Sequence, residues 1–336
     1  MKSKKRLVNR IVTCVLAVAS AAVAVSMMFY IRSFEHEHVA EQFGKQTRFA
    51  QITLFLPESA EFTADKIMYF RYKLDNALTE KAITPEKTGA RLYADAYSAF
   101  ADGTLYSSGK RSAKAKIAFV GGDYRLFHAA FAAQPEVTGD INHDRILLSR
   151  SAAWQLYGGS ELYDYTAEFN GKTYYISGVY DDFTGSNNEE FYADAVSATA
   201  DILAVPEKPV TCYELILVDP VKNFAVDTVK ECLDLAEGSY VLVENSKRFS
   251  LSNLFRTVPH IVSADEPLPT GVNLTPEELA SRRAEKVLAV LLVIFLSLAV
   301  YPLIWLLILL YRLIRLIKRL SDRYLFDKLK DKFSYS

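Results

Sequence analysis

Two long apolar runs without a charged residue lie near the two ends of this 336-residue chain. The first runs from Ile11 to Ile31 and the second from Val287 to Tyr311. At a rise of about 1.5 Å per residue, each is long enough to cross a hydrocarbon layer of about 30 Å. We therefore expect two transmembrane helices, at 11–31 and 287–311. A cleaved signal peptide ending near Ala24 is the alternative for the first run, but its apolar residues continue without a break.

The charges on either side of these runs predict an orientation. Residues 1–10 hold five Lys/Arg and no acidic residue, and residues 312–336 hold eight Lys/Arg and three Asp, so each end carries +5. The remaining 26 basic and 37 acidic residues lie between the runs. The positive-inside rule then predicts a cytoplasmic N-terminus (1–10), a basic cytoplasmic tail (312–336) and an extracytoplasmic segment, 32–286, at a bacterial cytoplasmic membrane. Three basic residues depart from this rule, because they lie just before the second run, on its predicted outer side: Arg282, Arg283 and Lys286.

The segment between the runs has the composition of a folded domain, since the chain is 24% charged and 12% aromatic. Cys14 lies in the first run, whereas Cys212 and Cys232 lie between the two runs. Cys212 and Cys232 could form a disulfide in an extracytoplasmic domain or could be two free, buried thiols, and the sequence does not decide between these alternatives. The spacing of Cys and His does not match a zinc site.

Each end of this segment reads as a strand, a helix and a strand. Strand patterns at 50–57 and 90–100 flank a helix at 63–82, and strands at 213–219 and 239–245 flank a helix at 221–235. Asp102-Gly103 predicts a hairpin after the second strand. Two such units commonly share one sheet with both helices on one face, the split βαβ arrangement.

The middle of the segment, about 114–180, is rich in short strands. Strand patterns occur at 116–120, 146–148, 165–169 and 172–180, and the last two are joined by the hairpin signal Asn170-Gly171. The predicted fold class is therefore α+β, with two transmembrane helices flanking a two-lobed extracytoplasmic domain, a split βαβ lobe carrying an inserted β-rich lobe.

Three stretches of the middle block carry a family resemblance. They read FVGGDYRLFHAAF, GDINHDRILLSRSAAWQLYGG and YTAEFNGKTYYISGVYDD. Their order and spacing resemble the MacB-type periplasmic core domain of ABC transporter permeases of the MacB and FtsX-like superfamily. The matching positions are Gly121, Tyr124, Phe127, Gly139, Asp144, Ser149, Ala152, Leu156, Tyr157, Gly158, Gly171, Ile176, Gly178 and Val179.

The resemblance implies a membrane subunit that works with a separate ABC ATPase and other permease subunits. The family has three spans after the outer domain, whereas we expect one here, so the usual C-terminal three-helix permease unit is not expected in this chain. The only GKT, at Gly171, lacks the upstream glycine of a phosphate-binding loop, so we expect no ATPase segment in this chain. A polysaccharide co-polymerase-like chain-length regulator with two spans is the alternative, because Pro-rich residues 265–276 precede the second run.

We expect no enzyme, cofactor or nucleic-acid partner, and homo-oligomerisation stays open. The motif residues are expected to have a structural role in the fold and no catalytic one. Ser149, for example, can cap a helix that ends at Gly158 or Gly159. His36 and His38 are more typical of a solvated stalk than of a metal site. The acidic cluster at 181–194 is more typical of a solvated loop than of a Ca²⁺ site.

A last group of residues lies after the second run. Thr275 and Pro276 predict a helix start, and no strong breaker precedes the span, although Pro302 lies within it. The helix is expected to continue past Tyr311. Basic side chains then recur every three or four residues and suit either cytoplasmic coupling or lipid anchoring. They are Arg312, Arg315, Lys318 and Arg319.

Overall fold

The computed structural model describes residues 2–333 except 35, 37, 44–46, 86, 88–89, 129–144, 163, 181–197, 204–208 and 264–266. The chain divides into two compact units. The first unit comprises Met1–Ser33, Leu251–Ser263 and Ala284–Ser336, and the second comprises Phe34–Ser250 and Ala264–Arg283. The second unit contains the sheet and is described first.

One lobe of the second unit has the predicted split βαβ arrangement. Its elements are β1 (Phe49–Phe55), α3 (Ala64–Glu80), β2 (Tyr93–Ser107), β8 (Cys212–Val218), α7 (Phe224–Cys232) and β9 (Val241–Glu244). The strands pair in the order β2-β8-β1-β9, and all three pairings are antiparallel. We call this the split lobe.

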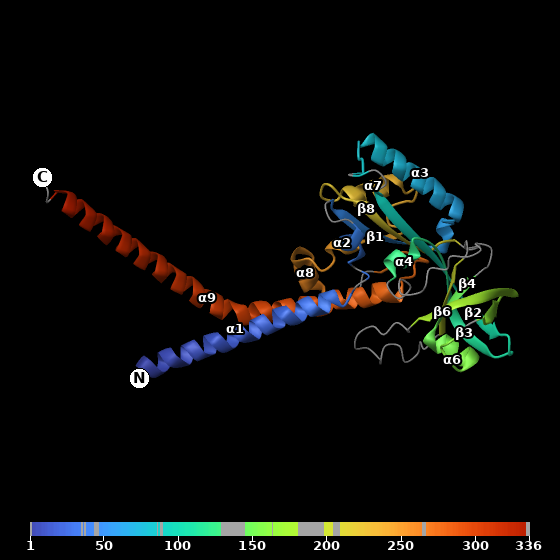
Figure 1. Cartoon of the computed structure of the whole chain (residues 1–336), viewed down its shortest axis with the longest axis horizontal. Helices are drawn as coiled ribbons and strands as arrows, with labels where there is room; N and C mark the ends of the chain where they lie inside the picture. The colour runs from blue at the N-terminus through green and yellow to red at the C-terminus, as the bar shows by residue number, and fades with distance from the viewer. Residues whose placement is uncertain are drawn as a thin grey trace. The chain divides into compact units, whose positions relative to one another are not determined.

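The apolar face of α3 packs on the sheet as its periodicity predicts. Ile67, Phe70, Leu74 and Leu78 are buried in one core with apolar residues of β1, β8 and α7. Helices α3 and α7 therefore cover the same face of these strands (Figure 1). The other face is covered partly by α2 (Val39–Phe43) and α4 (Tyr124–Phe127), which share a second core with β2, β3 and β8.

The inserted block closes on itself. Strands β3 (Ser112–Gly122), β7 (Ala198–Leu203), β4 (Arg145–Ser149), β6 (Lys172–Tyr180) and β5 (Thr166–Phe169) pair in that order, and both β3 and β5 also pair with β2. The β3–β7 and β4–β6 pairs are parallel. We call this closed arrangement the ring lobe. It uses β7 and the second half of β2, which lie outside the predicted bounds of 114–180.

The core of the ring lobe is filled by one helix and the inward side chains of the strands. Helix α6 (Arg150–Tyr157) buries Ala152, Ala153 and Leu156 against Ile146, Leu148 and residues of the other strands. Strand β2 is thus shared: residues from Tyr93 pair with β8 in the split lobe, and residues up to Ser107 pair with β3 and β5.

The predicted hairpin at Asp102-Gly103 is wrong. Strand β2 runs straight through it, and the chain turns later, where the Lys110 N–H donates to the carbonyl of Ser107 and Lys110 has φ of 64°. Gly103 is required for a different reason, because a Cβ atom there would lie 2.2 Å from the ring of Phe169. The second predicted hairpin is confirmed: Asn170 and Gly171 have φ of 50° and 78° and join β5 to β6.

The two long apolar helices are α1, which covers Lys2–Arg32, and α9, which covers Pro276–Phe333 as one helix with Pro302 inside it. The first unit contains α1 and all of α9 except its first residues, 276–283. The stretches Asn9–Arg32 and Pro276–Arg319 are long and apolar enough to cross a membrane. Helix α9 bends along its length (Figure 1), which a proline within a helix explains.

Short helices complete the chain. They are η2 (Glu58–Ala60), η4 (Asn245–Lys247), α8 (Leu251–Thr257) and η5 (Val258–His260). Helices α8 and η5 belong to the unit of the two apolar helices, although the sheet precedes them directly in sequence.

Candidate functional site

The start of α9 is fixed by its own sequence. The hydroxyl of Thr275 accepts a hydrogen bond from the Glu278 N–H at 3.3 Å, and Pro276 occupies the first helical position. Both features match the predicted helix start. The Glu278 side chain is engaged elsewhere, and it is the centre of a polar cluster that we call the junction. The junction lies wholly within the second unit.

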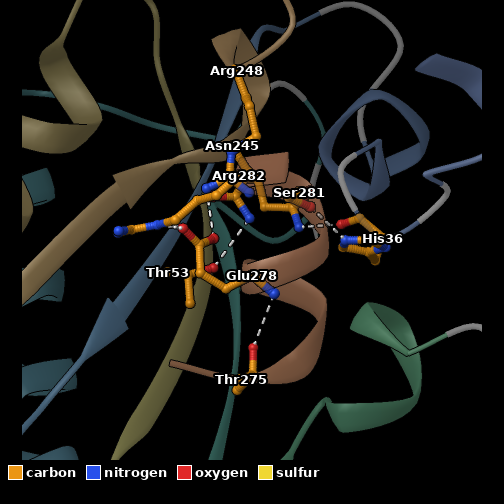
Figure 2. Close-up of polar contacts among 9 residues, drawn as sticks. His36, Thr53, Asn245, Arg248, Thr275, Glu278, Ser281 and Arg282 are labelled. Atoms are coloured by element: carbon orange, nitrogen blue, oxygen red, sulfur yellow. Dashed lines mark hydrogen bonds and ion pairs between the residues drawn. The ribbon is translucent and has the colours of Figure 1, made fainter. Parts of the chain in front are cut away.

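Glu278 lies between two arginines. Its Oε2 accepts from Arg248 Nη2 at 2.5 Å, and its Oε1 accepts from Arg282 Nε at 2.7 Å (Figure 2). The side chains of Arg248 and Glu278 are only 2% and 3% exposed. Charged residues are almost never this buried unless they are paired, so each holds the other in place.

The other residues of the junction connect α9 to β1 and to the segment after α1. Ser281 Oγ lies 3.1 Å from His36 Nε2, and the carbonyl of His36 accepts from Gln51 Nε2 at 2.6 Å. Asn245 Nδ2 donates to Thr53 Oγ1 at 3.2 Å. The first two turns of α9 are therefore hydrogen-bonded or ion-paired, directly or through one residue, to three other parts of the second unit: the segment at His36, β1 and the segment at Arg248 (Figure 2).

The polar groups of the junction are suited to holding the start of α9 in place. Within the described part of the chain, Gln51 Oε1 and Asn245 Oδ1 are buried without a hydrogen-bond partner, so two more donors could be accepted here. No group of three or more His, Cys, Asp or Glu suited to a metal ion occurs among the described residues. The arrangement can hold a helix end, and its burial makes loss of one charge costly.

A second buried network lies on the α3 face of the split lobe. Asp95 accepts hydrogen bonds from Arg71 Nε at 2.8 Å and from the Tyr213 hydroxyl at 2.7 Å. Burial raises the pKa of Tyr213 well above its usual value, and the charge of Asp95 adds to this. Burial alone would lower the pKa of Arg71, but the hydrogen bond and charge of Asp95 leave it raised. This network fixes α3 to the sheet.

Five of the predicted motif residues form or flank α6: Ser149, Ala152, Leu156, Tyr157 and Gly158. The Ser149 hydroxyl accepts from the Ala152 N–H, which confirms the predicted cap, and Gly158 ends the helix with φ of 77°. Ala152 and Leu156 are buried in the ring-lobe core. These residues serve the packing of α6 against the strands.

Of the other motif residues, Gly139 and Asp144 lie outside the described residues, and the rest lie in strands, in a turn or in α4. Gly121 faces Tyr97 so closely that a Cβ would lie 2.4 Å from its ring, and Tyr124 stacks on His128. Gly171 forms the β5–β6 turn. Gly178 and Val179 lie in β6, directly after the irregularity in its pairing with β4. The structure thus distributes the motif over the ring lobe and its border and does not gather it into one site.

The remaining predicted residues lie apart from the junction, except for His36. The expectation of a solvated stalk at His36 is corrected, because its ring contacts Ser281. Cys212 and Cys232 are free, buried thiols in different cores, and burial raises the pKa of both. The acidic cluster at 181–194 lies outside the described residues. The predicted basic residues are exposed on α9 in the first unit; they are Arg312, Arg315, Lys318 and Arg319.

Comparison with known proteins gives structural similarities only. No family model matches the chain, and no curated protein matches its sequence. The chain is similar to the periplasmic region of MacB from Actinobacillus actinomycetemcomitans, at 11% identity and a TM-score of 0.39, over 64% of this chain and 94% of that one.

Two further solved structures are similar to this chain. The extracellular domain of the noncanonic ABC-type transporter YknZ from Gram-positive bacteria matches at 10% identity and a TM-score of 0.33, over 58% of this chain and 100% of that one. A domain of a Porphyromonas gingivalis protein described as a permease matches at 13% identity and a TM-score of 0.34, over 62% and 96%. At such values these similarities assign neither activity nor partner.

Proposed function

We propose that this chain is a membrane-anchored subunit of an ABC-type transport or transmembrane signalling assembly, coupling a separate cytoplasmic ATPase to the extracytoplasmic domain. The observation that carries the proposal is the course of α9. One helix begins in the buried junction at Glu278, continues through the apolar run and reaches the basic residues at 312–319. A displacement of one end of such a helix is passed along its backbone hydrogen bonds to the other.

The proposed arrangement in the membrane follows the charges. Residues 11–31 and 287–311 cross the bacterial cytoplasmic membrane, residues 1–10 and 312–336 are cytoplasmic, and residues 32–286 are extracytoplasmic. In this arrangement the junction lies on the outer side, close to the start of the second span. Pro302 interrupts the helical hydrogen bonds, which neighbouring groups can restore within a membrane.

The mechanism that we propose divides the work between the two ends of α9. The outer domain holds the first two turns of the helix through Arg248, which pairs with Glu278, and through His36, which contacts Ser281. The cytoplasmic end presents four cations on about one third of its circumference, at positions 312, 315, 318 and 319. ATP hydrolysis is assigned to the partner ATPase, and the ring lobe and split lobe are the parts that receive the displacement.

Charge reversal at the cytoplasmic end tests this function. Arg315→Glu with Lys318→Glu should still insert in the membrane but should lose co-purification with an ABC ATPase and its permease subunits. The matched control is Lys4→Glu with Lys5→Glu, which makes the same charge change at the N-terminus and should retain the partners. If the unmodified chain captures no ATPase, the proposal is wrong, and capture of glycosyltransferases would favour the chain-length regulator.

A further inference from the structure

The segment from Leu251 to Ser263 carries large apolar side chains that face outward. Val262 is 95% exposed, Leu251 is 64% exposed and Phe255 is 52% exposed. Leu254 is 1% exposed, so α8 has one buried side, and Leu251 and Phe255 are one turn apart on another. Exposed apolar groups gathered on one short segment indicate a contact with something other than water.

One contact shows where this segment lies relative to the start of the second apolar run. Lys286 Nζ donates to the carbonyl of Ser263 at 3.3 Å, and Lys286 directly precedes the apolar run that begins at Val287. Ser263 therefore lies within the reach of one lysine side chain from the start of the second span. The segment 251–263 and the part of α9 from Ala284 onward belong to the same compact unit.

The charges of the segment also suit a membrane surface. Residues 251–263 contain no Asp or Glu, although acidic residues outnumber basic ones between the two spans. The cationic side chain of Arg256 is exposed on the same helix as Leu251 and Phe255. Apolar groups next to cationic ones, without carboxylates, are the composition of segments that lie in the headgroup region of anionic bilayers.

We propose that residues 251–263 form an interfacial element, with Leu251, Phe255 and Val262 inserted in the outer leaflet of the bilayer that the two helices cross. The occupant of this surface is lipid, because the contact to Lys286 places Ser263 next to the start of the second span. The inference rests on the proposed two-span topology and is independent of the ATPase partner. It assigns the element a role in holding the outer domain at a fixed height.

Fluorescence of the full-length chain in lipid vesicles tests this element. A Cys14→Ser background leaves only the buried Cys212 and Cys232, which serve as the labelling blank. Val262→Cys, carrying a polarity-sensitive nitrobenzoxadiazole label, should emit at shorter wavelength and lose intensity when the vesicles of phosphatidylethanolamine and phosphatidylglycerol contain nitroxide lipids. The matched control is Val221→Cys, since Val221 is also an exposed valine, at 65%, and it lies before α7. It should show neither change.

Each outcome decides the proposal. Lipid quenching at position 262 but not at 221 supports it, and Leu251→Cys should then be quenched as well. Equal emission at 262 and 221 without quenching overturns it. A shielded label at 262 that nitroxide lipids do not quench also overturns it, because a protein surface would then cover the segment. Topology is checked separately on cells, where an impermeant thiol reagent should label Lys110→Cys and not Ser334→Cys.

Discussion

The guanidinium of Arg248 lies 2.5 Å from the carboxylate of Glu278, and neither side chain is more than 3% exposed. Arg248 follows β9 and η4, whereas Glu278 lies in the first turn of α9. The pair therefore joins the edge of the sheet to the helix that continues into the second apolar run. Because both charges are desolvated, each depends on the other far more than in an exposed ion pair.

Removing one charge of this pair should destabilise the chain strongly. Glu278→Gln leaves Arg248 buried without its carboxylate, and we expect the free energy of unfolding to fall by about 3 kcal/mol. Urea unfolding of the detergent-solubilised protein measures this. Glu277→Gln is the control, because the same chemical change is made one residue earlier at a less buried position. Equal losses in the two variants would show that the ion pair does not hold the helix.

Gly103 should tolerate no side chain, although it lies in the middle of a strand. Gly103→Ala places a Cβ 2.2 Å from the buried ring of Phe169, and the forced repacking should cost about 1 to 3 kcal/mol of unfolding free energy. Gly109→Ala is the control, since the nearest atom there is 3.8 Å away. A thermal unfolding curve for each variant checks the prediction. Identical curves would mean that Phe169 does not approach the strand.

Substitution of Gly171 should destabilise the protein even though a new side chain there would touch no other atom. Nothing lies within 4 Å of a Cβ built at this position, but its φ is 78°. Gly171→Val should therefore lower the unfolding free energy by about 1 to 3 kcal/mol through backbone strain alone. Gly159→Val is matched to it, because that site is equally open and has no positive φ. If both variants unfold like the unmodified protein, the turn has another backbone geometry.

Alkaline pH should destabilise the split lobe. Burial raises the pKa of Tyr93 to about 12, and the nearby Asp75 adds to the effect. Between about pH 10 and about pH 12 the unfolded chain releases this proton while the folded chain keeps it, so the unfolding free energy falls as pH rises. Tyr93→Phe should make this fall shallower in urea unfolding series, and Tyr72→Phe, at an exposed position, should not. Parallel slopes for Tyr93→Phe and the unmodified protein would contradict the prediction.

The parts of the fold that sequence could predict are those set by local periodicity. The four buried residues of α3 repeat every three or four positions, and the structure places the helix at Ala64–Glu80, within the predicted 63–82. The caps at Ser149 and Thr275 and the turn at Asn170-Gly171 were likewise predictable, because each depends on neighbours within a few residues.

The parts that sequence could not predict depend on residues far apart in the chain. Asp102-Gly103 reads as a turn, yet the glycine is needed because Phe169 packs over it. Arg248 stands in the polar stretch ENSKRF, where no pattern separates a buried arginine from an exposed one. Its role follows only from the position of Glu278, and a charge pattern on one segment carries no information about a partner on another.

The closed pairing of the ring lobe also sets the order in which the protein can fold. Strand β2 begins at Tyr93, but the ring is complete only when β7, ending at Leu203, pairs with β3 and β4. The split lobe is completed later still, because β1 (Phe49–Phe55) pairs with β8 and β9, and β9 ends only at Glu244. Contacts between such distant residues make folding slow. The ring lobe can therefore close only after Leu203 has been synthesised, and the split lobe only after Glu244 has been synthesised.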